Sequence, residues 1–253
     1  MMRVPRLLRR NRRRGRRLLA LVPFRDEMRF LPGLFENLSG QVDGVIALDD
    51  QSSNDARAFV ESQPLLLDLI VVPAGAQGEL EDSKNHRALV EAAWDHGPAW
   101  LLGIDADERV EREFRQRAEG EIDRAEDAGE VALWVPFREL WGAYDRVRVD
   151  GVWGQKRKAC LFRSDREHRF DERRLHQIWA PWPPAGGEYR TADLNLYHLR
   201  MVRAEDREAR VERYRRLDPE RRWQEIGYDY LLDEEGLELA PLQPGRDYLP
   251  FGA

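Results

Sequence analysis

Three acidic residues stand at the end of a short apolar run, and their spacing suits metal and phosphate chemistry. Asp105, Asp107 and Glu108 follow residues 100–104, whose sequence is typical of a buried strand. In open α/β sheets, ligands bind where strands leave the core. Two carboxylates one residue apart on extended backbone point roughly the same way, so they repel each other unless a cation lies beside them. Because Mg²⁺ and Mn²⁺ take few carboxylates, several waters and substrate phosphates, the run predicts a metal–diphosphate site.

A second acidic pair and a polar segment follow two other apolar runs. Asp49 and Asp50 end one run, and Pro23, Arg25 and Glu27 follow another. If the runs are strands of one sheet, their ends face one cleft. One acidic pair can then hold the metal, while the other accepts hydrogen bonds from a nucleobase N–H or from ribose hydroxyls. The spacing therefore favours a nucleotide pocket built from three strand ends.

The elements that must position these residues alternate along the first 105 residues or so. Apolar runs predict buried strands, and apolar residues at helical spacing between them predict helices. The predicted strands are 18–22, 45–48, 69–72 and 101–104, and the predicted helices are 31–38, 55–62 and 80–94. This alternation indicates an α/β fold with a Rossmann-like, mostly parallel sheet that carries helices on both faces.

After residue 110 the pattern changes to a mixed, tryptophan-rich half. Its predicted elements are a helix at 112–128, strands at 131–137, 159–162 and 194–198, and a long polar helix at 203–225. We expect residues 229–253 to dock on the body of the protein as a tail.

Four segments, in the right order, resemble the family 2 glycosyltransferases, whose fold is the GT-A nucleotide-diphospho-sugar-binding fold. Residues 21–27 are similar to the family's first strand and the polar segment after it. Residues 48–55 resemble its Asp-Asp-Gly-Ser-Thr-Asp-Gly segment, although Gln51 replaces the usual glycine and Asn54 an aspartate. Residues 84–94 resemble the helix with a basic residue near the diphosphate, and residues 100–108 the Trp-x-x-x-x-Asp-x-Asp-Glu signature. Together, four such segments are more specific than any one alone.

The resemblance implies a role for each matching residue. It implies that Asp105 and Asp107 bridge Mn²⁺ or Mg²⁺ to the diphosphate, with Asp105 also on the nucleotide side. It further implies nucleotide contacts from Pro23, Arg25 and Glu27 at the uracil and ribose, from Asp50 and Asp49 at the base, and from Lys84 or Arg87 at the phosphates. His198 matches a histidine that closes over the metal or phosphates in some members. A buried, hydrogen-bonded core histidine is an equal alternative.

The reaction that the resemblance implies is metal-dependent transfer of a sugar, of the hexosyltransferase type, from a nucleotide-diphospho-sugar. UDP-sugar is the expected donor, an unknown hydroxyl on a carbohydrate, lipid-linked or other molecule is the acceptor, and the product is inverted. A carboxylate must take the acceptor's proton, and Asp150 is the predicted catalytic base, with Asp171 and Glu172 as other candidates. Two alternatives stay open: a catalytically degenerate GT-A-like binding protein, and a phosphatase of the haloacid-dehalogenase type.

Charge and composition suggest how the chain is organised. Nine arginines and no acidic residue lie between Arg3 and Arg17, although the formal net charge of the 253 residues is −6. We expect a solvated basic arm at 1–17, a catalytic domain at 18–202 with a nucleotide-sugar half (18–110) and an acceptor half (111–202), and a helical extension at 203–253. Nucleic acid is not an expected partner.

Localisation is predicted from the lack of a membrane-spanning run. No apolar stretch reaches the ~18–20 residues that a bilayer span needs, and Cys160 is the single cysteine. A lone cysteine excludes an internal disulfide and fits a reducing compartment. We expect a cytoplasmic protein. Peripheral contact of the basic arm with the inner face of the membrane is an open alternative.

Overall fold

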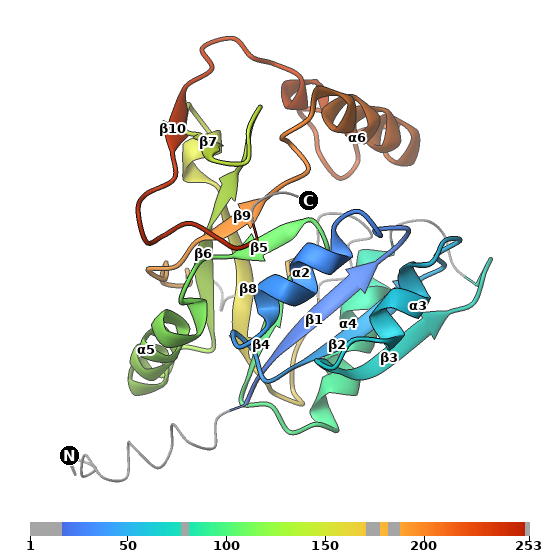
Figure 1. Ribbon diagram of the computed structural model, residues 1–253, viewed down its shortest axis with the longest axis vertical. Helices are drawn as coiled ribbons and strands as arrows, with labels where there is room; N and C mark the ends of the chain where they lie inside the picture. Colours follow the sequence, from blue (N-terminus) through green and yellow to red (C-terminus); the bar gives the residue numbers. More distant parts are fainter. Residues whose placement is uncertain (1–16, 77–80, 171–177, 182–187, 251–253) are drawn as a thin grey trace.

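The structure is a computed structural model that describes residues 17–76, 81–170, 178–181 and 188–250 (Figure 1). Nearly all of the basic arm predicted for residues 1–17 lies outside these described residues, and so do the two alternative bases, Asp171 and Glu172. None of the helices in the described ranges is long and apolar enough to cross a lipid bilayer.

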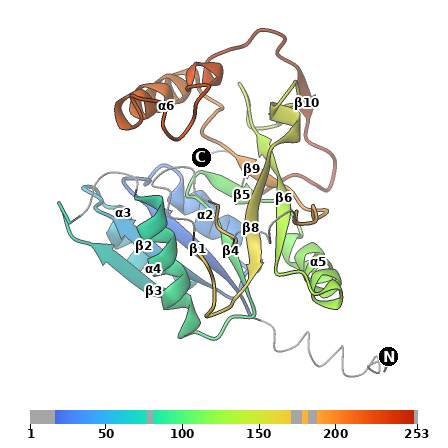
Figure 2. The same ribbon diagram turned by 180° about the vertical axis from the view of Figure 1, so that it is seen from behind.

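The first half contains the alternating strands and helices that the sequence predicts. The strands are β1 (Leu18–Phe24), β2 (Gly44–Asp50), β3 (Leu66–Val72) and β4 (Trp100–Gly103), and the helices are α2 (Leu31–Leu38), α3 (Ala56–Glu61) and α4 (Asp82–Trp94). β1 pairs in parallel with β2 and β4, and β3 pairs in parallel with β2. Helices lie on both faces, α2 in front of the sheet in Figure 1 and α4 in front of it in Figure 2. The predicted α/β fold class is confirmed.

The second half extends the same sheet with antiparallel and parallel pairs. Its elements are β5 (Glu108–Val110), α5 (Phe114–Ala128), β6 (Ala132–Glu139), β7 (Arg146–Arg148), η1 (Trp153–Gln155), β8 (Arg157–Arg163), β9 (Leu196–His198), α6 (Ala204–Leu217), η2 (Asp229–Leu231) and β10 (Leu239–Pro241). The eight-stranded sheet has the order β3-β2-β1-β4-β8-β6-β9-β5, and β10 pairs with β7 in a sheet of two strands. One sheet therefore runs through both predicted halves.

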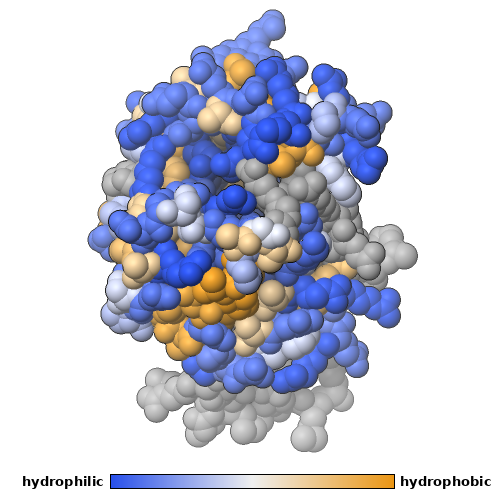
Figure 3. All heavy atoms as spheres, turned by 90° about the vertical axis from the view of Figure 1, so that its right-hand side faces the viewer, coloured by the Kyte–Doolittle hydropathy of each residue, from blue (hydrophilic) through white to orange (hydrophobic). Residues whose placement is uncertain are grey.

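Burial explains why the central strands appear in the sequence as continuous apolar runs. Every residue of β2 is buried, and β1 is buried at all but one position, because helices cover both faces of the sheet. β3 is the outermost strand, and its Leu67 and Val71 are 37% and 39% exposed. Figure 3 shows an apolar patch among hydrophilic side chains on this side of the molecule. The core therefore lies around β1, β2 and β4.

Helix α6 ends earlier than the sequence predicts. Its last residue is Leu217, whereas the polar pattern predicts a helix to residue 225. Pro219 disfavours helical backbone at Asp218, the residue before it. The Asp218 carboxylate then accepts backbone N–H groups of Arg222 at 2.7 Å and Trp223 at 3.1 Å, together with the Tyr228 hydroxyl at 2.8 Å. These bonds replace the helix with a turn that folds the following chain back.

The C-terminal segment contacts the body of the protein, as expected for a docked tail. β10 pairs antiparallel with β7, and Asp247 accepts two hydrogen bonds from Arg112 at 2.8 Å each. Tyr248 is fully buried and donates its hydroxyl to the Tyr144 carbonyl at 2.8 Å. The segment after α6 also closes a second apolar cluster, formed by Trp141, Trp153, Met201, Val211, Tyr228 and Leu231.

A close contact between Gly103 and Trp179 holds the end of β4. A Cβ atom at Gly103 would lie only 2.1 Å from Cδ2 of Trp179. Trp179 is almost fully buried and stacks on His86 of α4, with ring centroids 3.6 Å apart. Glycine at position 103 therefore makes room for an aromatic pair against the strand end that precedes Asp105.

We expect Gly103→Ala to destabilise the protein by about 1–3 kcal/mol, because the added methyl group must displace the Trp179 ring. Gly120→Ala in α5 is the matched control, since the nearest atom to its added Cβ is Arg124 Nη1 at 4.0 Å. This control should stabilise the helix by about 0.5–1 kcal/mol. Denaturant unfolding of both variants measures the difference, and equal effects at the two glycines would refute the packing argument.

Candidate active site

A cavity of about 560 Å³ lies where β1, β2 and β4 end, and one side of α6 forms the facing wall. The strand ends supply the lining from positions 23–27, Asp50 and 105–107. This is the edge of a parallel sheet at which α/β proteins bind ligands. The cavity therefore unites the three strand ends that the sequence analysis singled out.

The segment after β1 lines the cavity as predicted. Pro23, Arg25 and Glu27 all belong to the lining. Asp26 has a positive φ of 57°, and its Oδ1 accepts the backbone N–H of Ser53 at 2.7 Å. In return, the Ser52 hydroxyl accepts the Asp26 N–H at 3.1 Å. These bonds tie the β1 exit to the β2 exit and fix the two loops relative to each other.

The acidic pair of β2 divides between two environments. Asp50 lines the cavity, whereas the buried Asp49 does not and accepts a bond from Arg57 Nε at 2.5 Å. Successive side chains of a strand point to opposite faces, so only one of two adjacent residues can face the ligand. The sequence analysis expected Asp49 beside Asp50 at the base, but the structure does not bring Asp49 to the cavity.

Gln51, which stands where the resembled motif has glycine, has a left-handed backbone conformation. Its φ of 65° is left-handed, a region that glycine adopts without strain. The Gln51 side chain accepts the backbone N–H of Gly75 at 2.7 Å and donates to Asp50 Oδ1 at 3.2 Å. These bonds help to offset the strain and also orient Asp50.

Helix α4 brings residues to the cavity that the sequence analysis had not chosen. The exposed Lys84 pairs with Glu81 at 3.3 Å, and Arg87 lies over the Phe170 ring, so neither is part of the lining. Residues one position apart on a helix differ by about 100° in direction. Asn85 and His86, between the two basic residues, face the cavity instead.

The acidic run after β4 forms a turn rather than extended backbone. The Glu108 N–H donates to the Asp105 carbonyl at 3.0 Å, so the chain reverses between β4 and β5. Arg109 turns away from the cavity and donates to the carbonyls of Ala106 at 3.1 Å, Glu108 at 2.8 Å and Phe30 at 2.9 Å. The turn therefore has a fixed shape, and both Asp105 and Asp107 remain in the lining.

Lys158 of β8 neutralises one side of this turn. Its ammonium lies 2.9 Å from Asp105 Oδ2 and 2.6 Å from Glu108 Oε1. Burial opposes ionisation of Asp105, but the Lys158 charge outweighs it and holds the pKa of Asp105 below its usual value. Burial, together with the neighbouring Asp105 and Asp107 charges, raises the pKa of Glu108 to about 8, although Lys158 acts against it. Two carboxyl groups thus share one ammonium.

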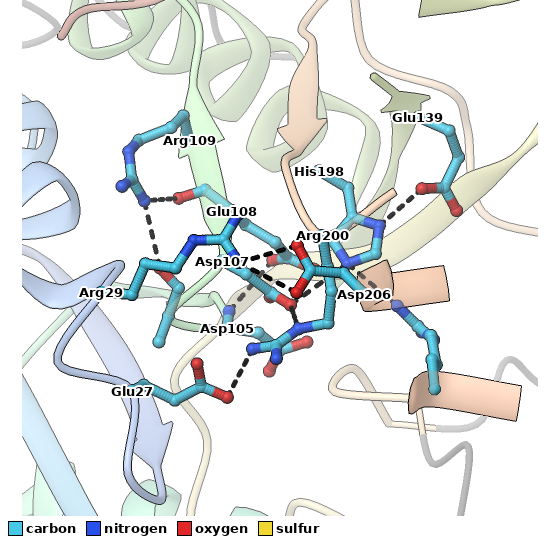
Figure 4. A network of polar contacts seen from close by, with 12 residues as sticks. Glu27, Arg29, Asp105, Asp107, Glu108, Arg109, Glu139, His198, Arg200 and Asp206 are labelled. Atoms are coloured by element: carbon cyan, nitrogen blue, oxygen red, sulfur yellow. Dashed lines mark hydrogen bonds and ion pairs between the residues drawn. The ribbon is translucent and has the colours of Figure 1, made fainter. Parts of the chain in front are cut away.

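Arg200 neutralises the other side of the turn. Its guanidinium binds Asp107 through Nε and Glu27 through Nη2, so it bridges the β4 and β1 exits (Figure 4). Burial opposes ionisation of Asp107, but Arg200 and His198 overcome it and hold the pKa of Asp107 well below its usual value. Asp107 is therefore a carboxylate at neutral pH.

His198 occupies the buried end of the same network. Its Nδ1 lies 2.5 Å from Glu139 Oε2, and its Nε2 lies 3.3 Å from Asp107 Oδ2 and 3.1 Å from Arg210 Nη1. Burial favours the neutral ring, yet the Glu139 and Asp107 carboxylates outweigh it and raise the pKa of His198 to about 9. Lys156 binds the second oxygen of Glu139 at 2.8 Å. His198 is thus a buried, hydrogen-bonded histidine that also lines the cavity, and its contact with a metal or phosphates stays a prediction.

The donor atoms around Asp107 fit a divalent cation in chemical type. A carboxylate oxygen and an imidazole nitrogen converge there, and Glu139 orients the ring from behind, as carboxylates commonly do for ligating histidines. Because the two carboxylates favour the protonated ring, His198 would have to release a proton to bind a metal. Within the described residues, no group of three or more His, Cys, Asp or Glu side chains is arranged to hold a metal ion. Mg²⁺ binds through one or two carboxylates, completed by waters and substrate phosphates. The donor set therefore suits a metal that arrives with a phosphate ligand.

Asp150 lies outside the cavity lining. Both of its oxygens accept hydrogen bonds from Arg148, at 2.8 and 2.9 Å, and Oδ1 also accepts the Glu238 N–H at 3.1 Å. The structure therefore joins Asp150 to the β7–β10 region rather than to Asp105 and Asp107. Its role as catalytic base stays a prediction.

Several cavity residues were missed by the sequence analysis because they come from the second half. Lys158, Arg200, Arg210 and Arg213 all line the cavity. The one available signal was the position of Arg200, two residues after His198 in a segment already compared with the family. Lys158 and the α6 arginines carry no local pattern that separates them from surface charge.

Comparisons with known proteins give distant similarity. No family model matches the chain. An uncharacterized protein of Mycobacterium tuberculosis is 25% identical over 264 aligned positions, which cover 90% of this chain and 62% of that protein, and an uncharacterized protein of Mycobacterium bovis gives the same values. The chain thus spans 62% of the length of the curated relatives that it matches.

Solved structures are similar in fold. The crystal structure of residues 1–349 of TarS from S. aureus in complex with UDP matches with a TM-score of 0.50 and 12% identity, over 86% of this chain and 70% of that one. Glucosyl-3-phosphoglycerate synthase from Mycobacterium tuberculosis, in complex with Mn²⁺, UDP and glucosyl-3-phosphoglycerate, matches with a TM-score of 0.36 and 16% identity, over 56% and 52% of the two chains. The TarS similarity extends over most of the chain and confirms the predicted GT-A fold.

We expect Glu139→Gln to lower the pKa of His198 from about 9 towards its ordinary value, because one of the two carboxylates that stabilise the imidazolium is lost. An NMR titration of the imidazole signals measures this change. His168 is the internal control, since burial lowers its pKa to about 4 and Glu139 is not among its partners. An unchanged His198 titration in the variant would contradict the assigned network.

Proposed function

We propose that this chain, on its GT-A fold, is a glycosyltransferase that takes a sugar from a nucleotide-diphospho-sugar, with a UDP-sugar as donor, and transfers it to an acceptor hydroxyl. One observation carries the proposal: a cavity at the strand ends gathers Asp50, Asp105 and Asp107 beside the cationic Lys158 and Arg200. The bound UDP in the TarS crystal structure supports the choice of nucleotide.

The nucleoside is proposed to bind at the exits of β1 and β2. Asp50 is nearly fully buried yet lines the cavity, so its carboxylate suits a base N–H. Pro23, Arg25 and Glu27 form the adjoining wall, where ribose hydroxyls find polar partners. Mutual bonds between Asp26 and the Ser52–Ser53 segment hold this wall in place before the donor arrives.

The diphosphate is proposed to bind at the turn after β4. Asp105 and Asp107, with His198, would hold Mn²⁺ or Mg²⁺, which neutralises the negative charge that develops on the leaving diphosphate. Lys158 and Arg200 already lie on these carboxylates and supply positive charge at the same place. The two side chains keep the acidic turn stable while no donor is bound, and they remain close to the phosphates when one is.

The Glu139 carboxylate is proposed to act as a positioning group. It faces His198 Nδ1 at 2.5 Å, so the ring presents Nε2 towards Asp107. Lys156 in turn anchors Glu139 at 2.8 Å. This chain of contacts orients the histidine without touching substrate itself. In the proposed reaction the acceptor hydroxyl attacks the anomeric carbon with inversion, and the nucleoside diphosphate leaves. The carboxylate that takes the hydroxyl proton stays a prediction at Asp150, which lies outside the cavity lining.

We expect UDP with Mg²⁺ or Mn²⁺ to raise the melting temperature on the order of 5 °C at about 100 times its dissociation constant, by mass action. UDP without metal should raise it much less. Asp107→Asn should abolish the metal-dependent part of the shift, because the carboxylate that faces His198 is lost. Thermal unfolding followed by circular dichroism provides the measurement.

Asp165→Asn is the matched control for this experiment. Asp165 is not part of the cavity lining and pairs with Arg163 at the surface at 3.2 Å. The control should respond to UDP and metal as the unchanged protein does. A full metal-dependent shift in Asp107→Asn would rule out the proposed metal bridge, and hydrolysis of a UDP-sugar by the unchanged protein would distinguish an enzyme from a degenerate binding protein.

A further inference from the structure

One side of α6 forms the cavity wall that faces the strand ends. Asp206, Ala209, Arg210, Arg213 and Tyr214 line the cavity, at the three- and four-residue spacing that places them on one face of a helix. The other side of α6 is anchored, because Val211 is buried in the second apolar cluster and Arg207 binds Glu234 at 2.9 Å. The helix is thus held so that these cavity-lining residues, which we call the charged stripe, face the cavity.

The carboxylates near this stripe already have cationic partners. Asp206 accepts two hydrogen bonds from Arg29 Nη1, at 2.9 and 2.7 Å. Across the cavity, Lys158 lies on Asp105, and Arg200 lies on Asp107. Arg210 and Arg213 add further positive charge on this wall, beside the cations that already bind Asp105, Asp107 and Asp206.

The guanidinium of Arg210 has donor capacity that the described residues do not use. Its Nε is buried and has no hydrogen-bond partner among the described residues. Its Nη1 lies 3.1 Å from His198 Nε2. A buried N–H without an acceptor costs stability, and phosphate or carboxylate oxygens fit the planar fork of arginine well. Arg213, one turn further along α6, borders the same space.

We propose that the acceptor substrate carries an anionic group, a phosphate or a carboxylate, that binds to Arg210 and Arg213 of α6. The inference rests on the proposed function, in which the donor occupies the strand ends. The acceptor then approaches from the α6 side, and its anionic group sits against the stripe while its hydroxyl faces the donor sugar. The pair of arginines selects charged acceptors over neutral sugars.

The test uses the full chain saturated with UDP and Mg²⁺ and titrated with inorganic phosphate, followed by NMR chemical-shift changes. We expect saturable phosphate binding while UDP is bound. The double variant Arg210→Gln/Arg213→Gln should weaken phosphate binding at least tenfold and leave the UDP-dependent melting shift intact. A parallel titration with acetate separates a carboxylate site from a phosphate site.

The matched control is Arg215→Gln/Arg216→Gln, which removes the same charge from α6 at positions outside the cavity lining. It should bind phosphate as the unchanged protein does. The single variant Arg213→Gln, at an exposed position, gives a decisive reading if the double variant does not fold.

The outcomes separate this inference from the proposed function. Loss of phosphate binding once UDP is bound would assign the arginines to the donor diphosphate and overturn the inference. Unchanged phosphate binding in the arginine variants would overturn it as well. If UDP itself gives no melting shift, the proposed function fails, and phosphate binding that depends on Arg210 and Arg213 would still support an anion site on α6.

Discussion

The cavity depends on charge compensation across the two halves of the chain. Asp105 and Asp107 come from the turn after β4, whereas Lys158 and Arg200 reach them from β8 and from the segment after β9. Without these partners, burial would disfavour two carboxylates so close together. The acidic turn after β4 therefore depends on cations from the second half, and the single continuous sheet brings the two halves together.

The same compensation shapes the proposed chemistry. Positive side chains lie around the acidic turn from two directions, through Lys158 and Arg200. When the proposed donor binds, its metal ion would take the place of Lys158 and Arg200 as the cationic partner of Asp105 and Asp107. The local charge would then stay balanced. The wall of α6 then remains cationic on the acceptor side. In the proposed reaction, the charge that each wall presents would then distinguish donor from acceptor.

The sequence predicts the strand ends well and the second half poorly, for physical reasons. Asp50, Asp105 and Asp107 stand out because apolar runs and the residues after them are local signals. Asp49 and Lys84 lie outside the cavity lining because the direction of a side chain depends on the register of its strand or helix against the sheet. Lys158 and Arg210 were missed because their partners are distant in sequence. The end of α6 was set too late because Pro219 outweighs a polar helical pattern.

Arg29 and Asp206 join the loop after β1 to helix α6 through two hydrogen bonds, at 2.9 and 2.7 Å. The loop belongs to the wall at which the nucleoside is proposed to bind, and the helix belongs to the opposite wall. A ligand that shifts either wall must act on the other through this link. If the proposed donor and acceptor each shift one of these walls, the ion pair couples their binding, and thermodynamic reciprocity requires each to alter the affinity for the other by the same factor.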